Sequence, residues 1–432
     1  MSNTTPDAVS RRAFIQTTAV ASAGLIFSGA HVAGSDILRV GLIGCGGRGT
    51  GAARDCLRGA DGVELVALGD LFPEAVTKCR AELAKALEGS GLEAKYKVTD
   101  ERCFSGFDAF QKVLASGIDL VILATPPAFR PVHLAAAVEA GKHIFAEKPV
   151  AVDSAGIRSV LATYEKARQR GLGIGVGTQR RHQAEYVPTV QRIHDGAIGE
   201  VLSGQVFWNQ GGLWVRDRQP EWTDAEWQIR NWLYFTWLSG DHIVEQHVHN
   251  IDVANWVLGA HPVKATAVGG RQWRTDPKFG HIYDHFAVDY EYASGARVSS
   301  MCRQIAGTRN RIGEHFIGTK GTSDPAGRIM GPAAWSFAKP EKPISPFVQE
   351  HTDLVASLRA GKPINGLKQI AESTLTAIMG REAAYTGQEV AWDEILNADQ
   401  DLMPPAMAFG PLKTPDVAIP GQTKLQRRWS EM

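Results

Sequence analysis

The segment Ile37-Leu-Arg-Val-Gly-Leu-Ile-Gly-Cys-Gly-Gly-Arg-Gly49 determines how the first half of the chain folds. Its first seven residues are mostly aliphatic and predict a buried strand, and residues 44–49 then read G-x-G-x-x-G. A helical pattern begins in this loop, and a second strand over 63–68 leads to Asp70. Glycines alone fit an ordinary turn, but this order of strand, glycines, helix, strand and acid predicts a dinucleotide-binding unit.

The glycine loop supplies the first candidate cofactor contacts. Glycines permit a tight turn and let the backbone approach a pyrophosphate at a helix N-terminus. An acid that ends the second strand bonds ribose hydroxyls and repels a 2′-phosphate, so Asp70 predicts NAD rather than NADP, although the nearby cation Arg48 argues the other way. The candidate contacts in this unit are Gly44, Gly46, Gly47, Arg48, Gly49 and Asp70.

Strands and helices continue to alternate up to residue 177. Strands are predicted over 118–124, 142–146 and 173–176, with a helix after the first of them and another over 154–170. This alternation predicts a doubly wound parallel sheet over residues 37–177, with ligands at the carboxyl ends of the strands. The further cofactor candidates near those ends are Thr125, Pro126, His133, Glu147 and Lys148.

The pattern changes after residue 178. Strand-like runs at 202–209, 263–269, 287–292, 296–302 and 311–318 have few long helices between them. They predict an open, mostly antiparallel sheet with helices on one face, in an α+β domain over 178–395. The segment 347–386 is helical by periodicity and is broken at 361–366. A Pro- and Gly-rich tail, 396–432, is expected to wrap a neighbouring subunit or the domain surface.

Several of these motifs together resemble one enzyme family. The glycine loop, Thr125-Pro-Pro127 and above all Ala140-Gly-Lys-His-Ile-Phe-Ala-Glu-Lys-Pro149 resemble the glucose–fructose oxidoreductase / inositol dehydrogenase / rhizopine-catabolism (Gfo/Idh/MocA) family, over roughly residues 37–395. The resemblance implies an NAD-dependent oxidoreductase acting on a sugar, glycoside or cyclitol. It also implies that Lys148 lies beside the nicotinamide and substrate, and that Gln179 and Arg181 contact the substrate.

A second cluster of polar residues lies on a helix predicted over 240–259. His242, Glu245, His249 and Asp252 share one stripe of this helix by their spacing. Such a stripe fits a solvated face, a metal site or a substrate site. The family pattern Asp-x-x-x-His-x-x-Asp favours the substrate site, with Glu245 where Asp is usual, and we expect no metal.

These residues give a mechanism of hydride transfer. Imidazole titrates near neutrality, so His249 is the expected base for the substrate hydroxyl. Lys148 would polarise the same oxygen, and Glu245 would orient His249 or bond an adjacent hydroxyl. Trp214 lies in a Trp-rich insertion, 211–237, whose indole rings suit the apolar faces of sugars, although core packing explains many such residues equally well.

The N-terminus has the pattern of an export signal. Ser10-Arg-Arg-Ala-Phe-Ile-Gln16 and the weakly apolar run up to Ala33 resemble a bacterial twin-arginine signal, so residues 1–36 predict a periplasmic protein without stable membrane insertion after cleavage. The alternative is an apolar anchor helix.

With 46 Lys and Arg against 46 Asp and Glu, the chain has no basic footprint for nucleic acid, and its five scattered cysteines predict neither a disulfide framework nor a zinc site.

An exported protein meets little free NAD, so the predicted location bears on the reaction. We expect a tightly bound cofactor that is recycled in place, either by oxidising one sugar and reducing another or, alternatively, by a glycosidase or lyase cycle through a transient keto-sugar. A non-catalytic sensor that binds dinucleotide and sugar is a further alternative. The open sheet and the tail predict a homodimer or homotetramer.

Overall fold

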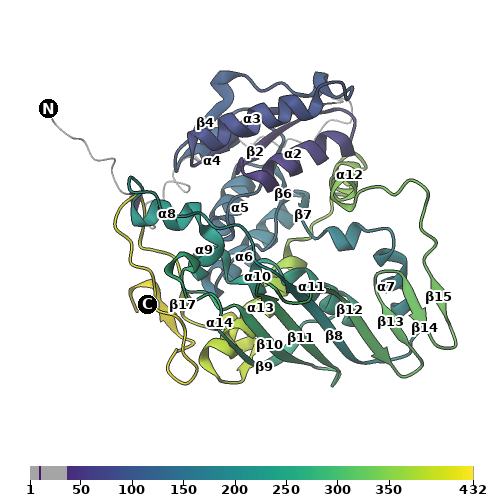
Figure 1. Ribbon diagram of the computed structural model, residues 1–432. Coiled ribbons are helices and arrows are strands. Elements are labelled where there is room, and N and C mark those ends of the chain that lie inside the picture. Colours follow the sequence, from purple (N-terminus) through teal and green to yellow (C-terminus); the bar gives the residue numbers. More distant parts are fainter. Residues whose placement is uncertain (1–8, 11–36, 432) are drawn as a thin grey trace.

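The computed structural model describes residues 9–10 and 37–431, arranged around two large sheets (Figure 1). The predicted export signal lies outside the described residues, apart from the short strand β1 (Val9–Ser10), which pairs with β18 (Ala406–Met407). In the part of the chain that is described, no helix combines the length and the apolar character needed to cross a membrane.

The first sheet has six parallel strands. Their order across the sheet reverses between β2 and β5, so the carboxyl ends of these two strands flank the crevice where a doubly wound fold binds its ligand. This confirms the predicted parallel sheet. In spatial order the strands are β4 (Cys103–Ser105), β3 (Val63–Asp70), β2 (Leu38–Ile43), β5 (Leu120–Leu123), β6 (His143–Ala146) and β7 (Ile174–Val176).

Helices cover both faces of this sheet because its strands are apolar on both sides. One face packs against α4 (Ala109–Ala115), α5 (Arg130–Glu139) and α6 (Ser154–Gln169). The other packs against α2 (Gly47–Gly59), α3 (Pro73–Leu87) and α12 (Pro346–Arg359), which inserts Leu354, Val355 and Leu358. The nucleotide-binding half therefore receives one covering helix from far beyond residue 178.

The second sheet has nine strands and is antiparallel except where β8 and β11 run parallel. One of its faces is covered by α10 (His242–Glu245), α11 (Val248–Leu258) and the long α13 (Leu367–Thr386) (Figure 1). The predicted open, mostly antiparallel sheet is confirmed. In spatial order the strands are β15 (Trp335–Ser336), β14 (Arg328–Met330), β13 (Thr322–Asp324), β12 (Arg311–Gly318), β8 (Val201–Gln210), β11 (Arg297–Gln304), β10 (His285–Tyr292), β9 (Pro262–Gly270) and β16 (Val390–Ala391).

The helix predicted over 240–259 is instead two helices, α10 and α11, with a break at Gln246 and His247. The predicted single stripe of polar residues is therefore wrong, since Glu245 ends one helix and His249 stands in the first turn of the next. Asp241, just before α10, has a positive φ of 71°. Its carboxylate is held by the amide of Tyr283 at 2.8 Å and the hydroxyl of Tyr385 at 2.5 Å, which fixes this unusual backbone.

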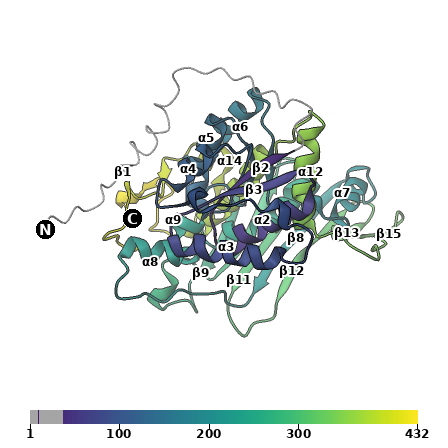
Figure 2. The ribbon, with the colours of Figure 1, turned by 90° about the horizontal axis from the view of Figure 1, so that it is seen from above.

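The insertion 211–237 folds into α8 (Asp224–Arg230), a 3₁₀ turn and α9 (Thr236–Ser239). Viewed from above, α8 lies beside the start of α3, at the edge of the first sheet (Figure 2). Two remaining helices are α14 (Trp392–Asn397), which packs on β9 and β16 at one end of the second sheet, and α7 (Tyr186–His194), which packs against α11.

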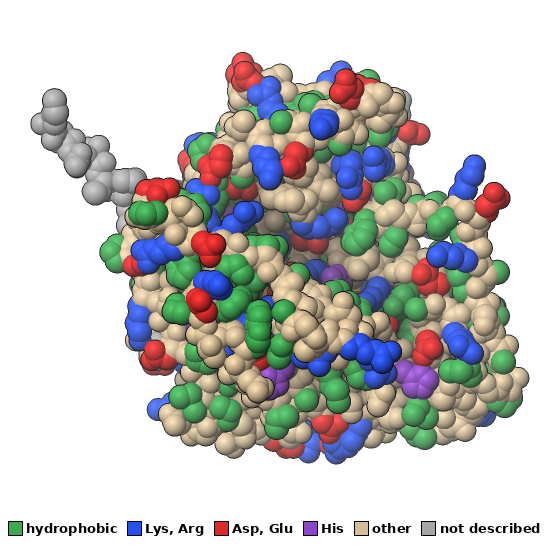
Figure 3. All heavy atoms as spheres, in the orientation of Figure 1, with side chains coloured by type: hydrophobic (Ala, Val, Ile, Leu, Met, Phe, Trp, Pro, Cys, Tyr) green, Lys and Arg blue, Asp and Glu red, His purple; other side chains and the backbone are tan. Residues whose placement is uncertain are grey.

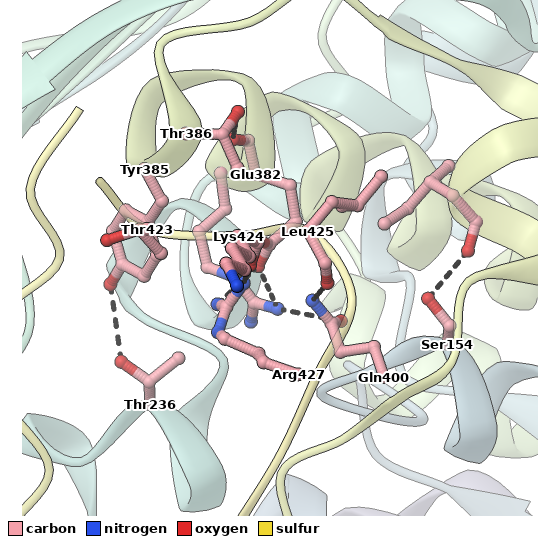
Figure 4. A network of polar contacts seen from close by, with 12 residues as sticks. Ser154, Thr236, Glu382, Tyr385, Thr386, Gln400, Thr423, Lys424, Leu425 and Arg427 are labelled. Carbon is pink, nitrogen blue, oxygen red and sulfur yellow. Dashed lines mark hydrogen bonds and ion pairs between the residues drawn. The ribbon is translucent and has the colours of Figure 1, made fainter. Parts of the chain in front are cut away.

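The tail wraps the surface of its own chain, which is one of the two arrangements that its composition predicts. β17 (Gln400–Asp401) pairs with β19 (Arg427–Arg428), and both guanidinium Nη atoms of Arg427 donate to the buried carboxylate of Glu382, at 2.6 and 3.0 Å (Figure 4). Nearby, the hydroxyls of Tyr385 and Thr236 are 3.2 Å apart, so the tail and α9 are both joined to α13.

Candidate active site

The glycine loop has the shape that a pyrophosphate requires. A Cβ on Gly49 would stand 1.8 Å from the carbonyl oxygen of Gly44, so only glycine lets α2 pack this closely on β2. A Cβ on Gly46 would meet nothing within 4 Å, because this face of the loop opens into a cavity. The amino end of α2 follows directly, and its free amides attract an anion. The loop therefore fits a dinucleotide.

Asp70 ends β3 at the rim of the same cavity. Its carboxylate accepts the amide of Cys45 at 2.7 Å and the amide of Phe72 at 3.0 Å, which fixes its position against the glycine loop. Burial raises the pKa of Asp70, while these two amides oppose the rise. The predicted ribose-binding residue is thus a preoriented carboxylate in the wall of the cavity.

Arg48 lies among a group of carboxylates. Its guanidinium lies 2.5 Å from Glu147, 3.2 Å from Glu350 and 3.6 Å from Asp55. A phosphate bound at Arg48 would also meet these three acids, so the arginine gives little support to a 2′-phosphate. Arg48 therefore does not favour NADP.

Thr125 and Pro126 line the cavity at the end of β5, as the sequence predicts for residues near the cofactor. His133 lines it too, with Nδ1 3.2 Å from the Thr125 hydroxyl and its ring against Phe110. Burial, followed by the charge of Arg130, lowers the pKa of His133 to about 3. A neutral, packed imidazole of this kind holds Thr125 in place.

The cavity has a volume of about 780 Å³ and extends from the glycine loop to the insertion. The molecule is visibly hollowed on this face, below the Rossmann elements (Figure 3). Trp214 lines the cavity together with Asp70 and Phe72, whereas Lys148 and His249 do not. The structure therefore places Trp214 at the cofactor cavity instead of with the predicted catalytic residues.

Lys148 and Glu245 meet across the two halves of the chain. The Lys148 ammonium donates to the Glu245 carboxylate at 3.0 Å and to the Glu245 carbonyl oxygen at 2.5 Å, and both side chains are nearly buried. The other Glu245 oxygen, Oε2, is buried and has no partner among the described residues. This pair places a cation and a free acceptor together at the carboxyl end of β6.

His249 stands beside this pair and stacks on Trp208, with ring centroids 5.6 Å apart. Burial, followed by the positive charges of Lys148, Arg180 and Arg48, lowers the pKa of His249 well below the usual 6.5. The imidazole is therefore neutral at physiological pH and able to accept a proton. Trp208 and Arg180 were not predicted as site residues, although Arg180 adjoins the two predicted residues Gln179 and Arg181.

Three other predicted residues, Arg181, His242 and Gln179, differ in their hydrogen-bond partners in the structure. Arg181 is held by the carboxylate of buried Asp252 at 2.8 and 3.1 Å, so these two residues are paired with each other, and the substrate contact of Arg181 stays a prediction. His242 is buried against Phe286 and bonds Asp241 at 2.9 Å, which makes it a support for α10. Gln179 keeps a buried Oε1 without a partner among the described residues and is compatible with a ligand contact.

Comparison with known proteins agrees with this geometry. Residues 38–176 match the description "Oxidoreductase family, NAD-binding Rossmann fold", and residues 189–324 match "GFO/IDH/MocA C-terminal domain". The chain is 29% identical to inositol 2-dehydrogenase of Rhizobium meliloti (strain 1021) over 289 residues, which cover 66% of this chain and 74% of that protein.

Two further similarities extend the comparison. The chain is 27% identical to scyllo-inositol 2-dehydrogenase (NAD(+)) of Bacillus subtilis (strain 168), over 66% of this chain and 72% of that one. Its fold resembles the crystal structure of aldose-aldose oxidoreductase from Caulobacter crescentus, with a TM-score of 0.63 and 21% identity over 82% of this chain and 99% of that chain.

Proposed function

The chain belongs to the Gfo/Idh/MocA family of NAD-binding oxidoreductases, and on that premise we propose that it transfers hydride between NAD and a secondary hydroxyl of a small sugar, glycoside or cyclitol. The observation that carries this proposal is the meeting of Lys148, Glu245 and neutral His249 at the carboxyl end of the first sheet. A base and a cation placed together suit the removal of a proton from an alcohol as its hydride leaves.

Each residue has a role in this proposal. Bound NAD supplies the hydride acceptor. His249 takes the hydroxyl proton, because its imidazole is neutral and has no hydrogen-bond partner among the described residues. Lys148 donates a hydrogen bond to the same hydroxyl oxygen, and Glu245 holds the ammonium in position while its free Oε2 accepts from an adjacent hydroxyl. A ring with two neighbouring hydroxyls would bind both groups, one hydroxyl at Lys148 and the other at Glu245 Oε2.

The test is reduction of bound cofactor by a panel of substrates. Absorbance at the wavelength of NADH would be followed after adding inositols, aldoses and glycosides one at a time to protein loaded with NAD. Reduction by at least one polyol is the expected result. Bound NAD that no member of the panel reduces would contradict the proposal and favour a sensor.

We also propose that the protein is exported already folded and keeps its NAD outside the cytoplasm. The five cysteines are all unpaired, which suits folding in a reducing compartment before export. A second sugar would then reoxidise the NADH. Mass spectrometry of small molecules released from protein purified without added cofactor is expected to find NAD(H) at one per chain, and an empty protein would contradict retention.

We propose that the open face of the second sheet contacts a second copy of the chain. Val268, Ala287 and Met301 lie side by side in register on β9, β10 and β11, and Val268 is 72% exposed. Burying such a row favours association. Val268→Lys with Met301→Lys is expected to lower the molar mass measured by light scattering, while an unchanged mass would contradict this interface.

A further inference from the structure

One wall of the NAD cavity comes from the insertion instead of the Rossmann elements. Residues of this segment line the same cavity as Asp70, Phe72 and Lys78. Because the acid after the second strand marks the ribose of the adenosine half, this wall belongs to the adenosine end of the site. The residues that the insertion contributes are Trp214, Arg216, Trp222, Ile229, Arg230 and Trp232.

Arg230 joins the insertion to the Rossmann elements at this end. Its guanidinium bonds Glu74, at the start of α3, with an N–O distance of 2.6 Å, and lies 3.7 Å from the ring centroid of Phe72. The tail adds a second contact, since Phe409 stacks on Phe72 with centroids 5.9 Å apart. Phe72, which lines the cavity, is thus contacted both by the insertion and by the tail.

The backbone of the insertion is fixed by hydrogen bonds. The Tyr234 hydroxyl donates to the Trp214 carbonyl oxygen at 2.8 Å, and the Trp227 indole N–H donates to the Arg216 carbonyl oxygen at 2.9 Å. The Arg216 amide in turn donates to the Asn231 side chain at 2.9 Å. Trp214 therefore stands at a set place on the cavity wall although 43% of its surface is exposed. An exposed, positioned indole is a surface on which a purine base stacks.

We propose that residues 213–232 form a clamp over the adenosine half of NAD. In this clamp Trp214 and Trp222 pack on the adenine, and the Arg230–Glu74 ion pair holds the insertion against α3. NAD then leaves only when this contact opens, which keeps the cofactor on the protein between turnovers. The inference rests on the retention of NAD proposed above and is independent of the substrate.

The test measures how fast NADH leaves. Each protein is loaded with NADH, mixed with excess NAD, and followed by NADH fluorescence. Trp214→Ala is expected to speed dissociation roughly tenfold or more, the usual effect of losing one stacked base. Glu74→Gln is expected to speed it about threefold, because the Glu74 side chain is 61% exposed and such pairs are weak. Trp214→Phe should restore slow release.

Two controls make the result specific. Trp273 is 44% exposed, like Trp214, but does not line the cavity, so Trp273→Ala should release NADH at the parent rate. Reduced nicotinamide mononucleotide lacks the adenosine half, so Trp214→Ala should leave its affinity unchanged. Unchanged NADH release in Trp214→Ala, or equal weakening of the mononucleotide, would overturn the clamp. Fast release from the parent protein that Trp214→Ala accelerates further would contradict retention yet support the clamp.

Discussion

Lys148 Nζ donates to the backbone carbonyl oxygen of Glu245, the acceptor that the amide of His249 would use in a continuous helix. The His249 amide instead reaches the Gln246 carbonyl oxygen at 3.4 Å, and the helix breaks. A single lysine from the Rossmann half thus both pairs with the Glu245 side chain and separates α10 from α11. Glu245 and His249 thus come from two short helices instead of one continuous helix, and His249 still lies near the ammonium of Lys148.

Removing the ammonium of Lys148 should stop hydride transfer without releasing NAD. Lys148→Met is expected to lower kcat by roughly 10²–10⁴-fold, because a charged hydrogen bond to the reacting oxygen is lost. The NAD content after purification should stay at the parent level. Lys368→Met, a change at an exposed lysine on α13, is the matched control and should keep full kcat. A Lys148→Met enzyme with parent turnover would remove this residue from the mechanism.

The acid limb of the pH–rate profile should report His249. Since burial and neighbouring cations lower its pKa, the imidazole is already neutral at pH 6.5 and loses its base function only in more acid solution. The value of kcat/KM is therefore expected to stay level as pH falls to about 6.5 and to decline below it. A decline centred at the ordinary histidine pKa would contradict the lowered pKa of His249. His249→Gln should abolish the decline along with most of the rate.

Arg181 should prove important for stability, with little effect on catalysis. Arg181→Leu leaves the buried carboxylate of Asp252 with Gln369 and Ser373 as its remaining side-chain donors among the described residues, and is expected to cost roughly 2–4 kcal/mol of unfolding free energy. Arg168→Leu breaks an exposed pair with Glu165 and should cost at most about 1 kcal/mol. Urea titration compares the two variants. A raised KM at parent stability would instead restore the predicted substrate contact.

Acid should destabilise the protein through its buried histidines. Burial lowers the pKa of His133, His247, His281 and His351 to about 3, so below pH 6.5 the unfolded chain binds protons that the folded one does not. Their stabilising contribution is complete above 6.5 and is lost as pH falls from 6.5 toward 3, at roughly 1.4 kcal/mol per pH unit for each histidine.

One variant tests that slope. His351 has no hydrogen-bond partner for either ring nitrogen among the described residues, and its ring packs at a tilt against Phe145 with centroids 3.9 Å apart. His351→Phe should keep this packing and reduce the pH dependence of the unfolding free energy by about one proton between pH 6.5 and 5.5. Melting curves at several pH values measure the change, and an unaltered slope would show that His351 is not titrating.

The first sheet could be predicted because its information is local. An aliphatic run, glycines at fixed spacing and an acid after the next strand all lie within residues 37–70. The break between α10 and α11 could not be predicted, since Lys148 lies 97 positions away in the sequence. Similarly, Gln179–His182 form a 3₁₀ helix, so Arg180 and Arg181 point differently and the distant acids Glu314 and Asp252 decide their roles.

Helix α12 has a consequence for how the protein is made. Leu354 and Leu358 cover an apolar strip of the first sheet, yet the ribosome synthesises them only after eight of the nine strands of the second sheet. A nascent chain with strands β2 to β7 already emerged still carries a bare apolar face, which chaperones recognise. The nucleotide-binding half is therefore complete only after α12 has been synthesised.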